Sequence, residues 1–308
     1  MSNIHFAAIR RGNKFSPNHT GNDSAIFELT MHRLYNKGCT VDIYTESEFC
    51  EKDIQEKFIY GMARDKCCVS KLQQCEDNGA FVINSGYGIE KCFRANMTIS
   101  LLNSNVPYPR SFLVNTGEDA TEAFNSLGGK IFWIKRGDFH AIHKEDVTPV
   151  HSIEEGNMIL KEFAVRNIKE AVISEHLIGD LVKFYGVRGT DFFYWFYPFD
   201  IQHSKFGHEA INGEAKHFPF DQHRLKEIST KAATVLDVYI YGGDAIIGAN
   251  GNIDIIDLND WPSFAPCRDE AFVYITEIIY KLAEEHSVRL ANEINNSKKN
   301  GYYTKSII

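Results

Sequence analysis

The sequence has no hydrophobic run that approaches the ~20 residues of a membrane-spanning helix. The N-terminal stretch MSNIHFAAIRRGNK also lacks the layout of a signal peptide, because its short apolar segment comes before the positive charges. We therefore expect a cytoplasmic protein with no membrane partner.

The chain also has no excess of basic residues. Lys and Arg number 33 against 41 Asp and Glu, which gives a net charge of −8 at pH 7. Nucleic-acid binding usually requires a basic face, so this charge balance argues against a nucleic-acid partner.

The cysteines show no CxxC pair, and their number, seven, is odd. Cys67 and Cys68 are adjacent, which is not the spacing of a zinc-ligand pair. In a reducing compartment we expect free thiols that serve mainly as packing residues.

The composition is that of an ordinary globular protein. Hydrophobic residues make up 44% and charged residues 24% of 308 positions, which is enough for two or three domains with their own cores. No internal repeat or low-complexity segment interrupts the chain.

The N-terminal region predicts an α/β domain with a parallel sheet. An apolar strand at 4–9 is followed by a polar loop, a helix that begins near Asn22 or Asp23 and stops at Gly38, and a second strand at 40–44. Ligands of such sheets bind beyond the carboxyl ends of the strands.

The polar loop after the first strand lies at that end of the sheet. It carries Arg10, Arg11, Ser16 and Asn18, which could hold an anionic substrate. A solvated surface loop explains the same residues equally well.

The remaining elements follow from periodicity, caps and turn residues. Strands are expected at 59–64, 80–84, 111–115, 131–135, 171–174, 181–187 and 192–197, and helices at 66–78, 89–103, 118–127, 153–166, 221–236 and 268–291. Two prolines near 107–109 force an extended connection and indicate a domain boundary at 94–109.

Two lysines occupy unusual positions in apolar strands. Lys135 ends the strand at 131–135, and Lys183 lies inside the strand at 181–187. Lysines are rarely buried unless paired, so each calls for an anion, and a nucleotide phosphate would serve. The alternative is a lysine whose ammonium group reaches solvent at the strand edge.

The segment Tyr241–Phe264 predicts a hairpin with an acidic face. Asn250-Gly251 is a strong two-residue turn signal between strands at 243–247 and 253–257. Asp257 and Asn259 are two residues apart and share a face, and Asp244 can lie beside them on the paired strand. The two aspartates interrupt apolar runs, where an unpaired carboxylate would be costly. We therefore prefer an Mg²⁺ site, which takes carboxylate and amide oxygens as ligands, to a solvated polar hairpin.

Lys135, the segment 175–179 and this hairpin together resemble the ATP-grasp superfamily, most closely its glutathione-synthetase-like and glutamate-adding ligases. The resemblance implies an N-terminal parallel α/β domain followed by two α+β subdomains that enclose ATP. The implied ranges are 1–97, 98–178 and 179–295, with a tail at 296–308.

The resemblance also implies roles in nucleotide binding. Lys135 would contact the α- and β-phosphates, and Lys183 the phosphates or the substrate. The backbone at Glu175 and Leu177 would read the adenine edge, with Asp180 placed for a ribose contact.

Further implied roles concern the cation and the flap over the phosphates. Asp244, Asp257 and Asn259 match the Mg²⁺ ligands, with Mn²⁺ as an alternative ion, and Arg94 takes a basic position where lysine is more common. The loop after Lys135 has one glycine where many members have several. His140 is a candidate substitute donor there.

The activity that the resemblance implies is an ATP-dependent ligase that joins a small carboxylate or peptide to an amine or thiol through an acyl phosphate. Arg268, or Arg10 and Arg11, would hold the acceptor carboxylate, as Arg pairs well with planar anions. Lys183 and Arg268 are the catalytic candidates, and Ser263 lies in the turn that leads toward the acceptor.

Two alternatives stay open. ATP-grasp inositol-phosphate kinases share the Asp, Asp and Asn metal set and an Arg-x-x-Met helix start similar to 94–97, although an acidic chain suits a polyphosphate substrate poorly. A non-catalytic nucleotide-binding module is the third reading. The oligomeric state is open, with a homodimer as one option.

Overall fold

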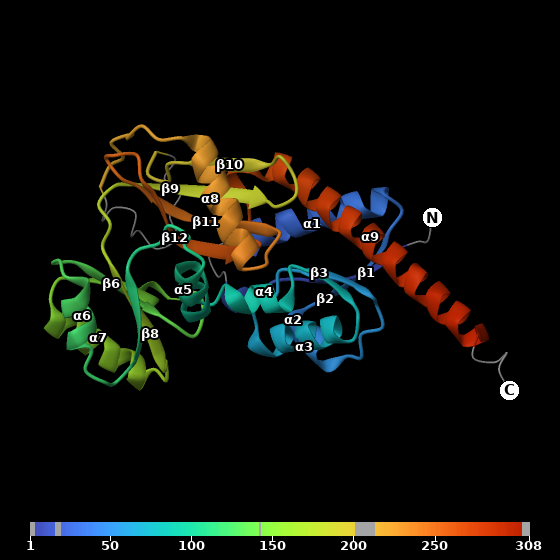
Figure 1. Cartoon of the computed structure of the whole chain (residues 1–308), viewed down its shortest axis with the longest axis horizontal. Helices are drawn as coiled ribbons and strands as arrows, with labels where there is room; N and C mark the ends of the chain where they lie inside the picture. The colour runs from blue at the N-terminus through green and yellow to red at the C-terminus, as the bar shows by residue number, and fades with distance from the viewer. Residues whose placement is uncertain (1–3, 16–19, 142, 201–212, 304–308) are drawn as a thin grey trace.

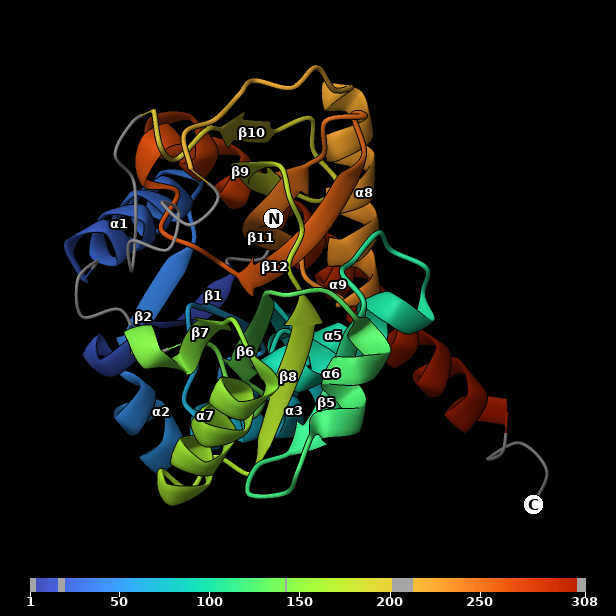
Figure 2. The same ribbon diagram turned by 90° about the vertical axis from the view of Figure 1, so that its left-hand side faces the viewer.

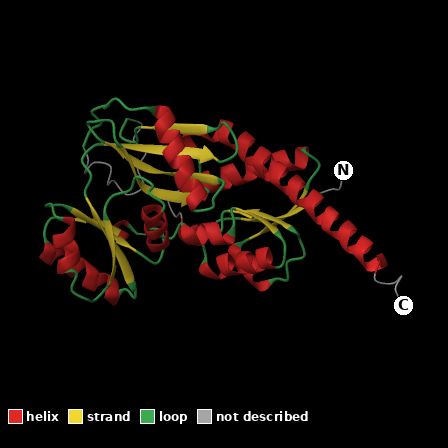
Figure 3. Cartoon of the chain, in the orientation of Figure 1, coloured by secondary structure: helices red, strands yellow, loops and turns green. Residues whose placement is uncertain are grey.

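The computed structural model describes residues 4–15, 20–141, 143–200 and 213–303, with side chains up to residue 292. The described chain forms three four-stranded sheets, each with its own helices (Figures 1 and 3). Among the described residues no helix combines the length and hydrophobicity that crossing a membrane requires.

The N-terminal sheet is entirely parallel, as the sequence predicts, with strand order β2-β1-β3-β4. Its elements are β1 (His5–Ile9), α1 (Thr20–Asn36), β2 (Thr40–Tyr44), α2 (Glu46–Glu51), β3 (Phe58–Gly61), α3 (Lys66–Asp77), β4 (Phe81–Ile83) and α4 (Gly86–Lys91). The loops after β1 and β3 leave the same edge of the sheet, which is the edge that faces the rest of the molecule.

The central sheet is antiparallel, with order β5-β8-β6-β7. It comprises β5 (Ser111–Asn115), β6 (Phe132–Arg136), β7 (Val147–Val150) and β8 (Glu170–Glu175), with α6 (Thr121–Leu127) and α7 (Ile153–Val165). The helices pack on the sheet through a separate core that includes Phe124, Phe132 and Phe163. The connecting helix α5 (Arg94–Asn103) precedes this sheet in the chain.

The C-terminal sheet is also antiparallel, with order β10-β9-β11-β12. It comprises β9 (Asp180–Val187), β10 (Phe193–Phe196), β11 (Ile240–Ile247) and β12 (Ile253–Asp260), with α8 (Gln222–Val235). Both views place it above the central sheet (Figures 1 and 2). The parallel sheet followed by two antiparallel ones confirms the predicted fold class.

The last helix, α9 (Arg268–Tyr303), ties the two ends of the chain together. Its buried residues, among them Ile275 and Ile279, share one core with Phe27 and Leu34 of α1 and with aromatic residues of the C-terminal sheet. Because this core spans the N-terminal and C-terminal sheets, α9 holds both against one another. Its far end extends beyond the body of the molecule (Figure 1).

Three elements differ from the sequence prediction. The helix expected at 89–103 is two helices, α4 and α5, because Phe93 takes an extended backbone and packs against Phe139 with ring centroids 4.7 Å apart. Helix α2 was not predicted, although Thr45 and Glu48 form a capping box at its start. Helix α9 runs on through 296–303, where the sequence predicts a tail, since no proline or glycine interrupts the helix before Gly301.

Candidate functional site

A cavity of about 290 Å³ lies where the three sheets meet. Side chains from β6, β8, β9, β11 and β12 line it, together with residues from the loops after β1 and β3. Eleven of the residues singled out from the sequence are among those that line it: Arg11, Arg94, Lys135, His140, Glu175, Leu177, Lys183, Asp244, Asp257, Asn259 and Ser263.

The hairpin β11–β12 places the candidate metal ligands close together on its two paired strands. Asp244 pairs directly with Asp257, and Asn259 pairs with Gly242 two residues further along. The register shifts immediately after this pair, between Asp244 and Ala245. The two carboxylates therefore face one another across the ladder, as close as neighbouring strands allow.

Each of these carboxylates is bound to a cationic side chain. Arg94 donates from Nη1 to Oδ1 of Asp257 at 3.0 Å and from Nη2 to Oδ2 at 3.3 Å, and the Nζ of Lys183 donates to Oδ1 of Asp244 at 2.8 Å. Burial alone would raise the pKa of Asp257, but Arg94, His140 and Lys135 outweigh it and lower this pKa to about 2. Asp257 is thus held ionised at any physiological pH.

Lys135 is a strongly perturbed cation that lines the cavity. Its residue is only 7% exposed, and its Nζ donates to the carbonyl oxygen of Ile256 at 3.3 Å. Burial, followed by the neighbouring charge of Arg94, lowers the pKa of Lys135 from 10.5 to about 7. An anion entering the cavity would stabilise the charged form of this side chain.

The segment between β8 and β9 forms an apolar side of the cavity. Trp133 donates from Nε1 to Nδ1 of His176 at 3.1 Å, and Leu177 lines the cavity next to them. The carboxylate of Glu175 accepts from the backbone N and the Nε of Arg110, at 2.8 and 3.0 Å. Aromatic and aliphatic side chains of this kind can accept a planar heterocycle.

A second group of charges lies where the N-terminal sheet borders the cavity. Arg11 contacts Asp23 with 3.5 Å between Nε and Oδ2, and Arg64 contacts Asp260 with 3.7 Å between Nε and Oδ1. His140 lies 3.2 Å from the same Asp260 oxygen, measured from its Nε2. Burial and the charge of Arg64 lower the pKa of His140 to about 4, so this imidazole is neutral at pH 7.

Sequence reasoning missed Arg64, Asp260 and Asp23 in this group. A signal for Arg64 was present, since it follows β3 at the same sheet edge where Arg11 follows β1. Asp260 gave no such signal, because its two buried neighbours, Arg64 and His140, come from distant segments.

Three predicted residues are not among those that line the cavity. Arg10 forms an ion pair with Glu28 at 3.6 Å, and Nη2 of Arg268 donates to Oδ1 of Asn22 at 2.6 Å. The carboxylate of Asp180 accepts from the backbone N atoms at positions 216 and 218, at 2.7 and 2.8 Å, and so anchors that segment to β9. Ser16 and Asn18 lie outside the described residues.

The donor chemistry of the hairpin fits a hard divalent cation. Asp244, Asp257 and Asn259 offer two carboxylates and an amide oxygen on one side of the cavity. Mg²⁺ takes such oxygen ligands and usually adds waters and substrate phosphates. Lys183 and Arg94, which bind the two carboxylates, would then share these carboxylates with the bound ion.

No protein-family model matches the sequence, and no curated protein matches it in sequence. Solved structures do match over nearly the whole chain. The D-alanine–D-alanine ligase from Bacillus anthracis, complexed with ATP, superposes with a TM-score of 0.63 at 13% identity, over 94% of this chain and 99% of that one.

Two further structures match as well. D-alanyl-alanine synthetase A from Vibrio cholerae gives a TM-score of 0.67 at 8% identity, over 92% of this chain and 100% of that one. An ATP-grasp RimK domain protein from Sphaerobacter thermophilus gives 0.62 at 12% identity, over 90% and 100%. The chain therefore has the ATP-grasp fold.

Proposed function

We propose that this protein is an Mg-ATP-dependent ligase that joins a carboxylate to an amine through an acyl phosphate. The observation that carries the proposal is the convergence of Lys135, Lys183 and Arg94 with Asp244, Asp257 and Asn259 in one cavity. Cations for phosphate groups and oxygen ligands for a metal are the two requirements of phosphoryl transfer from ATP.

The structural neighbours favour a ligase over a kinase. The names of the matched enzymes from Bacillus anthracis and Vibrio cholerae describe the joining of two alanine units. One of these structures contains ATP. A RimK domain protein is also among the matches. We therefore prefer an amino acid or peptide substrate to an inositol phosphate.

In the proposed complex the apolar side near Trp133 and Leu177 takes the adenine, and the phosphates extend toward Lys135 and Lys183. Bound Mg²⁺ would supply charge neutralisation for the phosphates. Arg94 keeps Asp257 ionised and in place, and a bound triphosphate would raise the pKa of Lys135, because it provides the anion that this buried ammonium lacks.

The acceptor carboxylate would bind at the border with the N-terminal sheet. Arg11 and Arg64 present two buried guanidinium groups there, and a guanidinium pairs well with a planar carboxylate. Asp23 offers a negative charge beside them for an ammonium group. This pairing of charges suits a zwitterionic amino acid or a peptide terminus.

The test is a screen of amino acids, in both configurations, and of short peptides for phosphate release from Mg-ATP, with mass spectrometry of the products. The proposal expects phosphate and ADP only when a carboxylate and an amine are both present, and a product lighter than the sum of the two by one water. ATP turnover on an inositol phosphate with no amine, yielding a phosphorylated product, would instead establish a kinase.

A pair of lysine variants separates turnover from folding. Lys183→Met should abolish phosphate release, whereas Lys226→Met should not, since Lys226 lies half-buried on α8, is not among the residues that line the cavity, and its Nζ donates to the backbone carbonyl oxygen of Asp191. ATP binding by calorimetry without any turnover across the screen would favour a non-catalytic nucleotide-binding module.

A further inference from the structure

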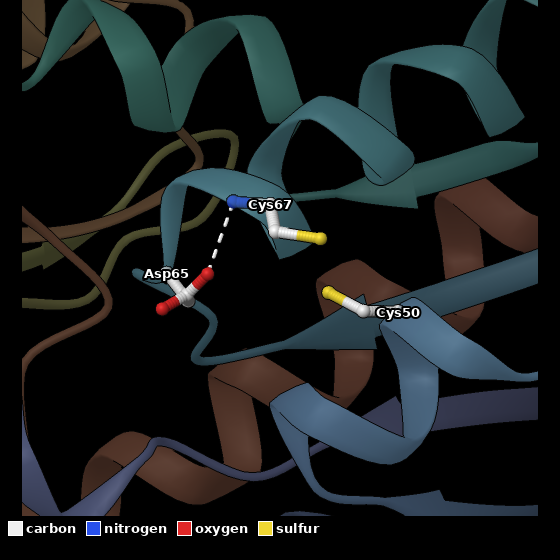
Figure 4. Close-up of side chains that lie close together, drawn as sticks. All are labelled: Cys50, Asp65 and Cys67. Atoms are coloured by element: carbon white, nitrogen blue, oxygen red, sulfur yellow. Dashed lines mark hydrogen bonds between the residues drawn. The ribbon is translucent and has the colours of Figure 1, made fainter.

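Two cysteines from different helices meet beside the N-terminal sheet, outside the cavity described above. Cys50 lies in the last turn of α2, and Cys67 lies in the first turn of α3. The two sulfur atoms and a carboxylate oxygen of Asp65 all lie within 4.8 Å of one another. Figure 4 shows the sulfur atoms pointing toward one another, with Asp65 to one side.

Asp65 is already committed to other partners. Its Oδ1 accepts from the backbone N of Cys67 at 3.0 Å and caps α3, and its Oδ2 accepts from Nζ of Lys14 at 2.5 Å. The Nζ of Lys71 is bound nearby, to the carbonyl oxygen of Cys50 at 3.2 Å. Two ammonium groups and a helix N-terminus make this corner unfavourable for a divalent cation. The same charges favour the approach of an anionic reagent.

The two thiols differ in accessibility. Cys67 is exposed, whereas Cys50 is half-buried. Burial, together with a hydrogen bond to Cys67, raises the pKa of Cys50 to about 12. The exposed thiol is therefore the one that meets a reagent first, and the half-buried thiol keeps its proton until its neighbour has reacted.

We propose that Cys50 and Cys67 are an oxidisable dithiol that closes to an intramolecular disulfide on reaction with a small-molecule disulfide such as oxidised glutathione. The two sulfurs lie within 4.8 Å and point toward one another, and an S–S bond requires them to approach to ~2 Å. The helices that carry the two cysteines, α2 and α3, are in contact with one another.

The reaction balances in two exchanges. The Cys67 thiolate attacks one sulfur of oxidised glutathione, a mixed disulfide forms, and one glutathione thiolate leaves and takes up a proton. Cys50 then loses its proton and attacks the Cys67 sulfur, and the second glutathione leaves as a thiol. Two protein thiols are oxidised, and one glutathione disulfide is reduced to two thiols.

The disulfide would join α2 to α3, the helices on either side of the loop that carries Arg64. Glu46, at the start of α2, accepts from the backbone N of Arg64 at 2.5 Å, and Asp65 begins α3 on the other side. Arg64 itself lines the cavity. Cys67 thus lies three residues away from Arg64, which contributes to the candidate active site.

The experiment treats the reduced full-length chain with oxidised glutathione and follows its intact mass. We expect a loss of two hydrogen atoms, restored by dithiothreitol. Trypsin would release Cys50 in the peptide 38–52 together with Cys39, and Cys67 in the peptide 67–71 together with Cys68. Fragmentation of the linked peptides must therefore assign the bond to Cys50 and Cys67.

Cysteine variants provide matched controls. Cys50→Ser should stop the reaction at a glutathione adduct on Cys67, and Cys67→Ser should form neither the adduct nor the internal bond. Cys75→Ser, also on α3, should still close the disulfide. A wild-type protein that stops at the glutathione adduct, a bond assigned to Cys39 or Cys68, or one equivalent of copurified zinc that blocks oxidation would each overturn the proposal.

Discussion

Replacing Lys135 by methionine tests whether the buried charge of Lys135 lowers the stability of the ligand-free protein while it favours the binding of an anion. Without a ligand, the buried ammonium of Lys135 has one long hydrogen bond, 3.3 Å to the carbonyl oxygen of Ile256, and lies close to the charge of Arg94. Methionine has a similar length and no charge. We therefore expect Lys135→Met to stabilise the ligand-free protein and to weaken ATP binding.

The magnitude follows from the pKa. The pKa of Lys135 falls from 10.5 in an exposed chain to about 7 in the folded protein, chiefly through burial. At about 1.4 kcal/mol for each pKa unit, this difference sets an upper limit of about 5 kcal/mol on the destabilisation by the charged lysine. Relaxation around the ammonium reduces this limit, so we expect the variant to gain about 2–4 kcal/mol at pH 6.

The gain should depend on pH with a definite sign. Between pH 7 and 10.5 the unfolded chain keeps the Lys135 proton while the folded protein loses it. The unfolded state then binds more protons, so the stability of the wild type rises with pH across this window. The advantage of Lys135→Met should be full below pH 7 and shrink toward pH 10.5.

The assay is urea unfolding of both proteins at pH 6 and pH 9 with a chelator present, so that no metal occupies the site. Calorimetric ATP titration measures binding in parallel, and Lys226→Met on α8, away from the cavity, serves as the control. The reasoning would be refuted if Lys135→Met were less stable than the wild type at pH 6, or if the stability difference were the same at both pH values.

Three other substitutions probe the packing and charge around the site. Asp257→Asn should abolish Mg-ATP turnover and lower the free energy of unfolding by about 3 kcal/mol, because it leaves the buried Arg94 without its charge partner. Asp146→Ala should lower the free energy of unfolding by about 3–5 kcal/mol in urea, since this fully buried carboxylate binds Arg136 of β6 and Arg166 at the end of α7. Gly243→Ala should abolish turnover, because the new Cβ would lie 2.2 Å from the carbonyl oxygen of Asp257, whereas Gly21→Ala meets nothing within 4 Å and should leave turnover unchanged.

Each of these variants has an outcome that would contradict the argument. Asp254→Asn lies on the same strand as Asp257 but is not among the residues that line the cavity, so it is the matched control and should retain turnover. Equal loss in both aspartate variants would point to a folding defect, and full turnover in Asp257→Asn would remove Asp257 from the site. Unfolding of Asp146→Ala at the wild-type urea midpoint would show that its two arginine contacts add nothing to stability.

Much of the architecture follows from local patterns. The turn at Asn250-Gly251, the period-two spacing of Asp257 and Asn259, and the apolar strands at both ends of the chain predict the hairpin and the parallel sheet, because these features act within a few residues. The break at Phe93 was not predictable in this way. It depends on a ring contact with Phe139, 46 positions further along.

The candidate site residues could be named from the sequence: two lysines in apolar strands, and the acidic residues and Asn259 of a hairpin. Their partners depend on the tertiary structure. It brought Arg94 to Asp257 across 163 positions and placed Arg64 and Asp260 together, and it directed Arg268 to Asn22 and Asp180 to a neighbouring backbone segment. Local patterns specify the direction in which a side chain leaves its strand, whereas the ion pair that it finally makes depends on how separate sheets pack against one another.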